Sequence, residues 1–143
     1  MICTFFGNRD TPQEIEPILY QTIIRLIKEQ GVTLFYVGNH GRFDRMAYHC
    51  LKRVKQQFPL IQYFVVLAYL PRGKDGFEYL WEETIYPEGL EQVPYRLAII
   101  KRNEWMIERA DFVVTYTAYS QGGAGKFQDI AEKKGKTIIS LKS

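Results

Sequence analysis

Short apolar runs alternate with longer amphipathic stretches along the chain. The runs at residues 2–6, 33–37 and 61–68 are rich in aliphatic and aromatic residues and are followed closely by turn residues, a pattern typical of buried strands. Between them, apolar residues recur at helical spacing over residues 11–30 and 44–58. Strand, helix, strand, helix, strand is the order that builds a parallel sheet with helices packed on its faces.

The second half of the chain repeats this alternation after an irregular connection. Residues 71–94 are rich in Pro and Gly, so we expect a lid or an irregular edge there, with a short strand at 84–86. The expected elements that follow are a helix at 95–110, a strand at 112–115, a helix ending at Lys134 and a strand at 137–141. We predict one α/β domain over residues 1–143, a Rossmann-like three-layer sandwich with a mainly parallel central sheet.

Polar residues before two of the helices are candidate N-caps. Thr11 is followed by Pro12 and, three residues after the threonine, by Glu14, the spacing of a capping box. Asp44 precedes the second apolar stretch and is interpreted first as an N-cap, with a contact to a ribose hydroxyl as the alternative. Gly31 is expected to end the first helix.

Composition and charge exclude several classes of protein. The chain has 143 residues, of which 46% are hydrophobic, and its 19 basic and 16 acidic residues are mixed along the sequence, so no basic stripe predicts nucleic-acid binding. No apolar stretch approaches membrane-spanning length, and Met1 leads directly into a strand-like segment, so we expect a cytoplasmic protein. Cys3 and Cys50 form no ligand cluster, and we expect no metal site and no cofactor.

A glycine-rich loop before the last helix is the strongest indication of chemistry. Gly122, Gly123 and Gly125 precede Lys126, and glycines let a backbone approach an anion where a helix start offers unpaired N–H groups. The alternative is a tight turn without a ligand. The loop lacks the Gly and Ser/Thr positions of a Walker A motif and the third Gly of the dinucleotide fingerprint.

Two further loops are expected at the same edge, because ligands of open parallel sheets bind at the carboxyl ends of the strands. Arg9 follows Gly7 in the first loop and could bind phosphate, unless it is simply solvated. The second loop offers three candidate ligand contacts, which are Gly38, Gly41 and Asp44.

Two other side chains are ambiguous. Arg102 could reach inward from its helix or pair with Glu108 or Asp111. His40 could be a general acid or base, but a histidine in a glycine turn is more often an ordinary loop residue.

Taken in order, these segments resemble the SLOG superfamily, and within it the YpsA-like and DUF1273-type proteins. The likeness is carried by FGNR at residues 6–9, by VGxxGxFDxxA at 37–47, by RNxWMIxxAD at 102–111, and by GGAG with AxxxGK at 122–136. The resemblance runs through nearly the whole chain and leaves residues 71–94 without a strong match. It implies a Rossmann-like fold whose glycine-rich loops bind nucleotide-derived ligands, in some members ADP-ribose-like signals.

The same superfamily includes LOG phosphoribohydrolases, which cleave the bond between a base and a ribose phosphate. Their signature PGGxGTxxE is only partly present, because Gln121 replaces the Pro, Lys126 the Thr, and Gln128 with Asp129 stands where the acidic pair is expected. A Gln cannot exchange a proton as a carboxylate does. Asp129, Glu82 or Glu83 would therefore have to supply the catalytic carboxylate.

Our leading hypothesis is a binding protein for a phosphate-bearing, nucleotide-type small molecule such as ADP-ribose or a nucleoside phosphate. The alternative is a phosphoribohydrolase acting on a nucleoside monophosphate, and a third is an assembly module with a vestigial pocket. We expect no nucleic-acid or membrane partner. Trp81, Tyr95 and Trp105 lie in segments that could leave apolar surface at an edge, which is compatible with a homo-oligomer.

Overall fold

The computed structural model describes residues 1–71, 78–117 and 123–141. Its strands are β1 (Ile2–Gly7), β2 (Leu34–Val37), β3 (Gln62–Val66), β4 (Thr84–Ile85), β5 (Phe112–Tyr116) and β6 (Thr137–Ser140). Its α-helices are α1 (Glu16–Gln30), α2 (Arg42–Gln57), α3 (Ala98–Arg109) and α4 (Gly123–Lys133). Short 3₁₀ turns are η1 (Gln13–Ile15), η2 (Trp81–Glu83), η3 (Leu90–Gln92) and η4 (Tyr95–Leu97).

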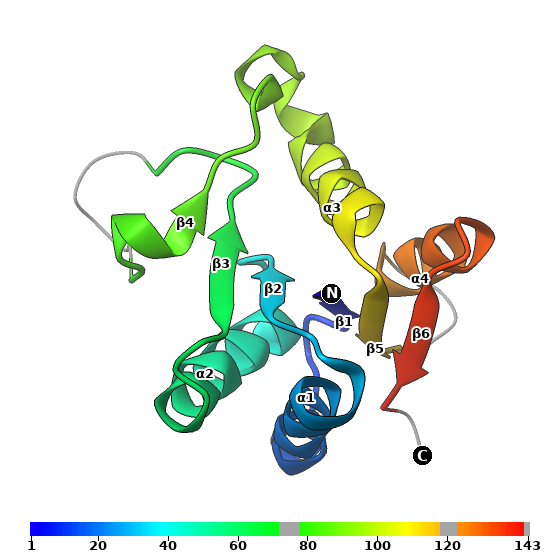
Figure 1. The fold of residues 1–143 in the computed structure, drawn as a ribbon. Coiled ribbons are helices and arrows are strands. Elements are labelled where there is room, and N and C mark those ends of the chain that lie inside the picture. Colours follow the sequence, from blue (N-terminus) through cyan, green and yellow to red (C-terminus); the bar gives the residue numbers. More distant parts are fainter. Residues whose placement is uncertain (72–77, 118–122, 142–143) are drawn as a thin grey trace.

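The six strands form one sheet in the order β4-β3-β2-β1-β5-β6, and every neighbouring pair is parallel. The chain moves outward from β1 to β4 and then crosses back to β5 on the other side of β1 (Figure 1). Strand order therefore reverses between β1 and β5, the place where open α/β sheets form a ligand crevice. The predicted α/β, Rossmann-like architecture is confirmed.

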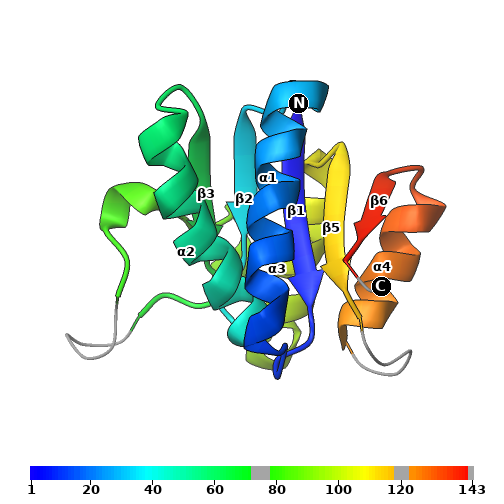
Figure 2. The same ribbon diagram turned by 90° about the horizontal axis from the view of Figure 1, so that it is seen from below.

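Helices cover both faces of the sheet, which completes the three layers. In Figure 2, α1 and α2 lie in front of the sheet and α3 lies behind it. One apolar cluster joins the sheet to α1 and α2 and includes Leu19, Ile23 and Leu51. A second cluster joins the opposite face to α3 and α4 and includes Met106 and Phe127. Leu19, Ile23 and Met106 occupy apolar positions at the helical spacing that the sequence showed.

The two predicted N-caps are wrong. Helix α1 is preceded by η1, whose N-cap Pro12 offers no side-chain bond, and the Thr11 hydroxyl instead donates to the Asn8 carbonyl at 2.6 Å. Helix α2 begins at Arg42 with Gly41 as its N-cap, so Asp44 lies inside the first turn. Ser, Thr and Asp satisfy loop backbone groups as readily as helix starts, and sequence spacing does not distinguish the two uses.

The described part of the irregular connection, residues 78–94, contributes an edge to the sheet. Strand β4 pairs with the end of β3, which confirms the short strand expected at residues 84–86. The connection is anchored by the buried Glu83, whose carboxylate accepts hydrogen bonds from Tyr48 and Tyr63. Trp81 and Tyr95 are exposed, whereas Trp105 packs edge-on against Tyr36.

Candidate functional site

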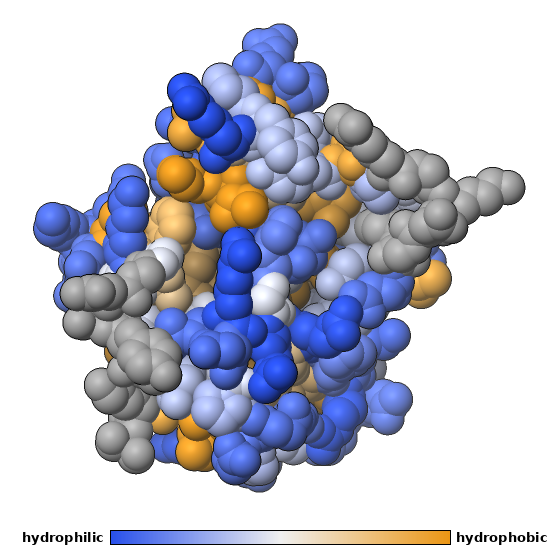
Figure 3. All heavy atoms as spheres, turned by 180° about the vertical axis from the view of Figure 1, so that it is seen from behind, coloured by the Kyte–Doolittle hydropathy of each residue, from blue (hydrophilic) through white to orange (hydrophobic). Residues whose placement is uncertain are grey.

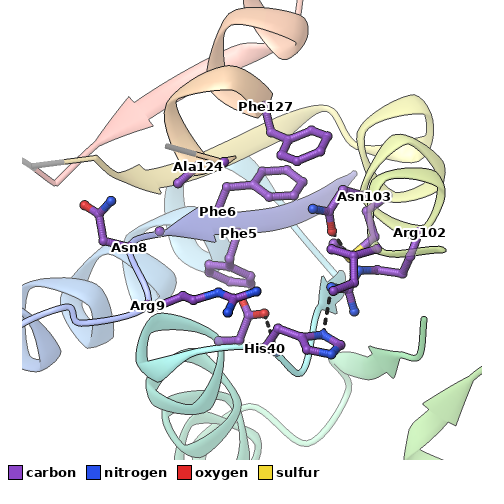
Figure 4. Close-up of a pocket in the computed structure, with 14 residues that line it drawn as sticks. Phe5, Phe6, Asn8, Arg9, His40, Arg102, Asn103, Ala124 and Phe127 are labelled. Atoms are coloured by element: carbon purple, nitrogen blue, oxygen red, sulfur yellow. Dashed lines mark hydrogen bonds between the residues drawn. The ribbon is translucent and has the colours of Figure 1, made fainter. Parts of the chain in front are cut away.

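A cavity of about 290 Å³ lies at the carboxyl end of β1, next to the point where strand order reverses. Its walls come from the end of β1, the loop between β2 and α2 with the first turn of α2, one side of α3 and the start of α4. Figure 3 looks onto this edge of the sheet, where hydrophilic side chains occupy the centre and hydrophobic ones lie beside them. Figure 4 shows the cavity closely. Parallel sheets bind ligands at this edge.

The structure brings five of the predicted site residues together in the lining of the cavity: Gly7, Arg9, Asp44, Arg102 and Gly123. They come from four separate segments of the chain. Arg9 extends from the end of β1 across the cavity toward the side of His40 (Figure 4).

The remaining predicted residues lie elsewhere. Gly38 stands just behind the lining, and Gly41 lies with Arg9 and Arg42 in a neighbouring cavity. Gly125 and Lys126 belong to α4 but do not line the cavity, and Gly122 falls outside the described residues.

The glycines of the first two loops serve close packing. A Cβ added to Gly7 would lie 2.2 Å from Cγ of the buried Phe43. A Cβ on Gly38 would lie 2.7 Å from Oδ2 of Asp44, so this glycine makes room for the carboxylate. Gly41 has a φ of 95° and its Cβ would lie 2.9 Å from Cα of Arg9. These glycines let the two loops and α2 meet, a role that sequence alone does not separate from ligand contact.

Arg102 is the centre of a hydrogen-bond network at the back of the cavity. Its side chain is 1% exposed, and its Nη1 donates to the Val66 carbonyl at 2.9 Å and to Asn39 Oδ1 at 3.1 Å. Its Nε donates to Asn103 Oδ1 at 2.7 Å, and Nη2 lies 3.2 Å from His40 Nδ1. Arg102 therefore reaches inward and does not pair with Glu108 or Asp111, the alternative that the sequence left open.

Burial and the two arginines set the charge states around this network. Burial raises the pKa of Asp44 to about 6, although Arg102, the His40 amide and Arg9 all act in the opposite direction. Asp44 Oδ2 accepts the His40 N–H at 2.9 Å. Burial, followed by the charges of Arg102 and Arg9, lowers the pKa of His40 to about 4. His40 is therefore neutral at pH 7, and the two arginines face a single carboxylate among the described lining residues.

Apolar side chains form the opposite wall. The rings of Phe6 and Phe127 stack with their centroids 5.5 Å apart, and Ile99 and Met106 complete the surface. The sequence did not identify these four residues as candidates for ligand contact, because apolar positions in strands and helices are indistinguishable from core. Only the position of Phe127 could have suggested ligand contact, since it directly follows the glycine-rich loop.

The carboxylates considered for hydrolysis lie away from the cavity. Asp129 is exposed on α4 and Glu82 is exposed on η2, and neither lines the cavity. Glu83 is occupied by the hydrogen bonds that anchor η2. Asp44 is the carboxylate that the described lining contains.

In residues 1–71, 78–117 and 123–141, no helix has the length and apolar character needed to cross a membrane. Within these ranges, no three His, Cys, Asp or Glu side chains gather in an arrangement that could hold a metal ion.

Comparison with known proteins identifies a fold. No family model matches the sequence, and no curated protein matches it. The solved structure of DNA processing protein A (DprA) from Streptococcus pneumoniae matches with a TM-score of 0.66 at 14% identity. The match covers 96% of this chain and 49% of the DprA chain, so this chain spans about half the length of that relative. The likeness establishes a shared Rossmann-like parallel α/β fold.

Proposed function

We propose that this chain binds a phosphate-bearing, nucleotide-derived small molecule in the cavity beside β1. The ligand class is ADP-ribose or a nucleoside phosphate, and the chain is a SLOG-like domain that acts in ligand binding or sensing. The observation that carries the proposal is the combination, in one cavity, of the cationic Arg9, the start of α4 and an aromatic wall.

The cationic part of the cavity suits a phosphate. Arg9 is exposed, and it forms no ion pair within 4 Å with any carboxylate of the described residues. Gly123 and Ala124, the first two residues of α4, line the same cavity, and the first turn of a helix carries unpaired N–H groups and the positive end of the helix dipole. A phosphate between them would be bound by a guanidinium fork and by backbone amides.

The apolar part suits a ring. Phe6, Phe127 and Met106 offer a surface on which a base or a sugar face can pack. A volume of about 290 Å³ is near the lower limit of ligand pockets, which fits a nucleoside monophosphate, or one half of a dinucleotide-like ligand with the rest outside.

The geometry gives less support to hydrolysis of an N-glycosidic bond. The resemblance to LOG phosphoribohydrolases suggested Asp129 as the catalytic carboxylate. Asp129 is exposed on α4 and does not line the cavity. Asp44 lies in the cavity, but its Oδ2 is engaged by the His40 amide. We therefore put binding first.

Isothermal titration calorimetry tests the proposal. The panel is ADP-ribose, cyclic ADP-ribose isomers, NAD and nucleoside monophosphates. We expect at least one ligand to bind, and Arg9→Ala to weaken that binding about tenfold or more, because a charge-assisted hydrogen bond contributes about 1.5–3 kcal/mol.

Gly123 supplies a matched pair of variants. A Cβ on this residue meets no atom of the described residues within 4 Å, so Gly123→Ala should bind like the parent. Gly123→Trp places a large ring at the rim of the cavity and should abolish binding. An absence of heat with the whole panel would refute the proposal, and so would a ligand that Gly123→Ala and Gly123→Trp bind equally well.

A further inference from the structure

Asn103 is a nearly buried amide at the back of the cavity, next to Arg102 on α3. Its side chain is 8% exposed, and its Oδ1 accepts the Nε–H of Arg102 at 2.7 Å. An arginine has donors only, so the atom that faces it must be the amide oxygen. The orientation of the Asn103 amide is therefore fixed, with its NH₂ group turned away from Arg102.

The NH₂ group of Asn103 points into the cavity. Figure 4 shows the amide nitrogen directed toward the side of Phe6 and Phe127. No hydrogen bond joins this nitrogen to another residue of the described ranges. Because Asn103 lines the cavity, a bound ligand can supply an acceptor for this donor.

The surroundings of this donor select a neutral acceptor. Phe6, Phe127 and Met106 disfavour a charged phosphate here, because removing an anion from water into an apolar wall is expensive. Arg9 and the start of α4 offer that phosphate a better position. A carbonyl oxygen or an unprotonated ring nitrogen on the edge of a planar heterocycle matches both the apolar wall and the N–H donor.

We propose that Asn103 is a specificity-determining residue whose NH₂ group donates to an acceptor on the ring of the ligand, so that the apolar half of the cavity is the subsite for a nucleobase. This inference rests on the proposed function, and it names the part of the nucleotide that each half of the cavity recognises.

Arg102 is a positioning residue for Asn103. Its guanidinium is buried and donates to the Val66 carbonyl, to Asn39 and to Asn103. His40 adds an acceptor, because its Nδ1 faces a donor-only group and must be unprotonated. Arg102 thus acts on the ligand through the orientation that it imposes on Asn103.

The variant Asn103→Asp tests this role. Aspartate keeps an oxygen for the Nε–H of Arg102, so the fold should be preserved, while the group facing the cavity changes from a donor to an acceptor. The control Gln62→Glu adds the same charge at the amino end of β3, where the side chain is exposed. Affinities for AMP and for ribose 5-phosphate, which lacks the base, are measured by calorimetry for the parent and both variants.

We expect the parent to bind AMP more tightly than ribose 5-phosphate. Asn103→Asp should weaken AMP binding roughly tenfold or more, since a ring acceptor then faces a carboxylate, and should change ribose 5-phosphate binding much less. Gln62→Glu should match the parent. If Asn103→Asp binds AMP as the parent does while Arg9→Ala weakens it, the inference is wrong and the proposed function stands. If the parent binds neither probe nor any other ligand of the panel, the proposed function itself fails.

A second measurement needs no variant. The side-chain NH₂ signals of Asn103 in a ¹⁵N-labelled sample should shift on addition of AMP and stay in place on addition of ribose 5-phosphate. Unchanged signals at saturating AMP would overturn the inference even if Asn103→Asp did not fold.

Discussion

Replacing Gly7 with Ala should destabilise the protein by overpacking, because this glycine lies directly against Phe43. The new Cβ would stand 2.2, 2.4 and 2.7 Å from Cγ, Cδ2 and Cβ of Phe43, where ordinary carbon contacts are about 3.5–4 Å. Phe43 is 1% exposed in the first turn of α2, so its ring has no free volume into which to move. Relief requires a shift of about 1 Å or more in the ring or in the loop.

Overpacking of a well-filled core costs about 1–3 kcal/mol, and the short distances place this substitution at the upper end, near 3 kcal/mol. For a chain of this length, about 3 °C of Tm corresponds to 1 kcal/mol, so Tm should fall by about 10 °C. Gly123→Ala is the control, and its Tm should be unchanged or slightly raised, since alanine is the better helix former.

Thermal unfolding followed by circular dichroism measures both variants. The cause is checked with a double-mutant cycle, because Gly7→Ala should cost much less when Phe43 is already Leu. Two results would show that the contact with Phe43 is not the reason for a glycine at position 7. One is a Tm of Gly7→Ala within about 2 °C of the parent, and the other is an equal loss of stability from Gly7→Ala in the parent and in the Phe43→Leu background.

Three further substitutions test polar groups that are wholly or partly buried, which are Asp44, His40 and Glu83. Because the pKa of Asp44 is raised to about 6, its contribution to stability is complete below roughly pH 4 and is lost as the pH rises through 6. In urea titrations, Asp44→Asn should therefore gain stability relative to the parent as the pH rises from 4 to 7. A difference in unfolding free energy between the two proteins that stays constant with pH would contradict this. The pKa of His40 is lowered to about 4, so its contribution to stability is present above roughly pH 6.5 and is lost as the pH falls through 4. His40→Gln should therefore tolerate acid better than the parent. Equal midpoints of acid unfolding for the two proteins would count against this prediction. Glu83→Gln should lower the free energy of unfolding in urea by about 1–3 kcal/mol, because it disturbs the hydrogen bonds from Tyr48 and Tyr63. The control Glu82→Gln, at the exposed neighbouring residue, should change stability by less than about 0.5 kcal/mol. Equal effects of the two substitutions would refute the anchoring role of Glu83.

The fold was predictable because its signals are local and repeated. Each strand is a short apolar run, each helix carries an apolar stripe, and their alternation leaves few topologies other than a parallel sheet. The helix boundaries were less predictable. Asp44 has the residue type of an N-cap, yet Gly41 takes that position because its positive φ is needed where the backbone passes Arg9.

The candidate site was predictable only in part. Loops after parallel strands converge on one edge, so the meeting of Arg9, Asp44 and Gly123 follows from topology. The network of Arg102 could not be read in the same way, since its partners lie 36 to 63 residues away on other elements, apart from the adjacent Asn103. Tertiary packing decides which acceptors a buried guanidinium finds.

Amide chemical shifts provide the most direct test of ligand binding beside β1. A ¹⁵N-labelled sample is titrated with ADP-ribose and, as a control without phosphate, with adenosine. Binding in this cavity predicts that the largest shifts on adding ADP-ribose occur at Arg9, His40, Gly123 and Ala124, and that adenosine produces much smaller shifts at Arg9 and Gly123. Saturating ADP-ribose that leaves these four amides in place, or that shifts residues at the amino ends of the strands instead, would contradict the proposed site.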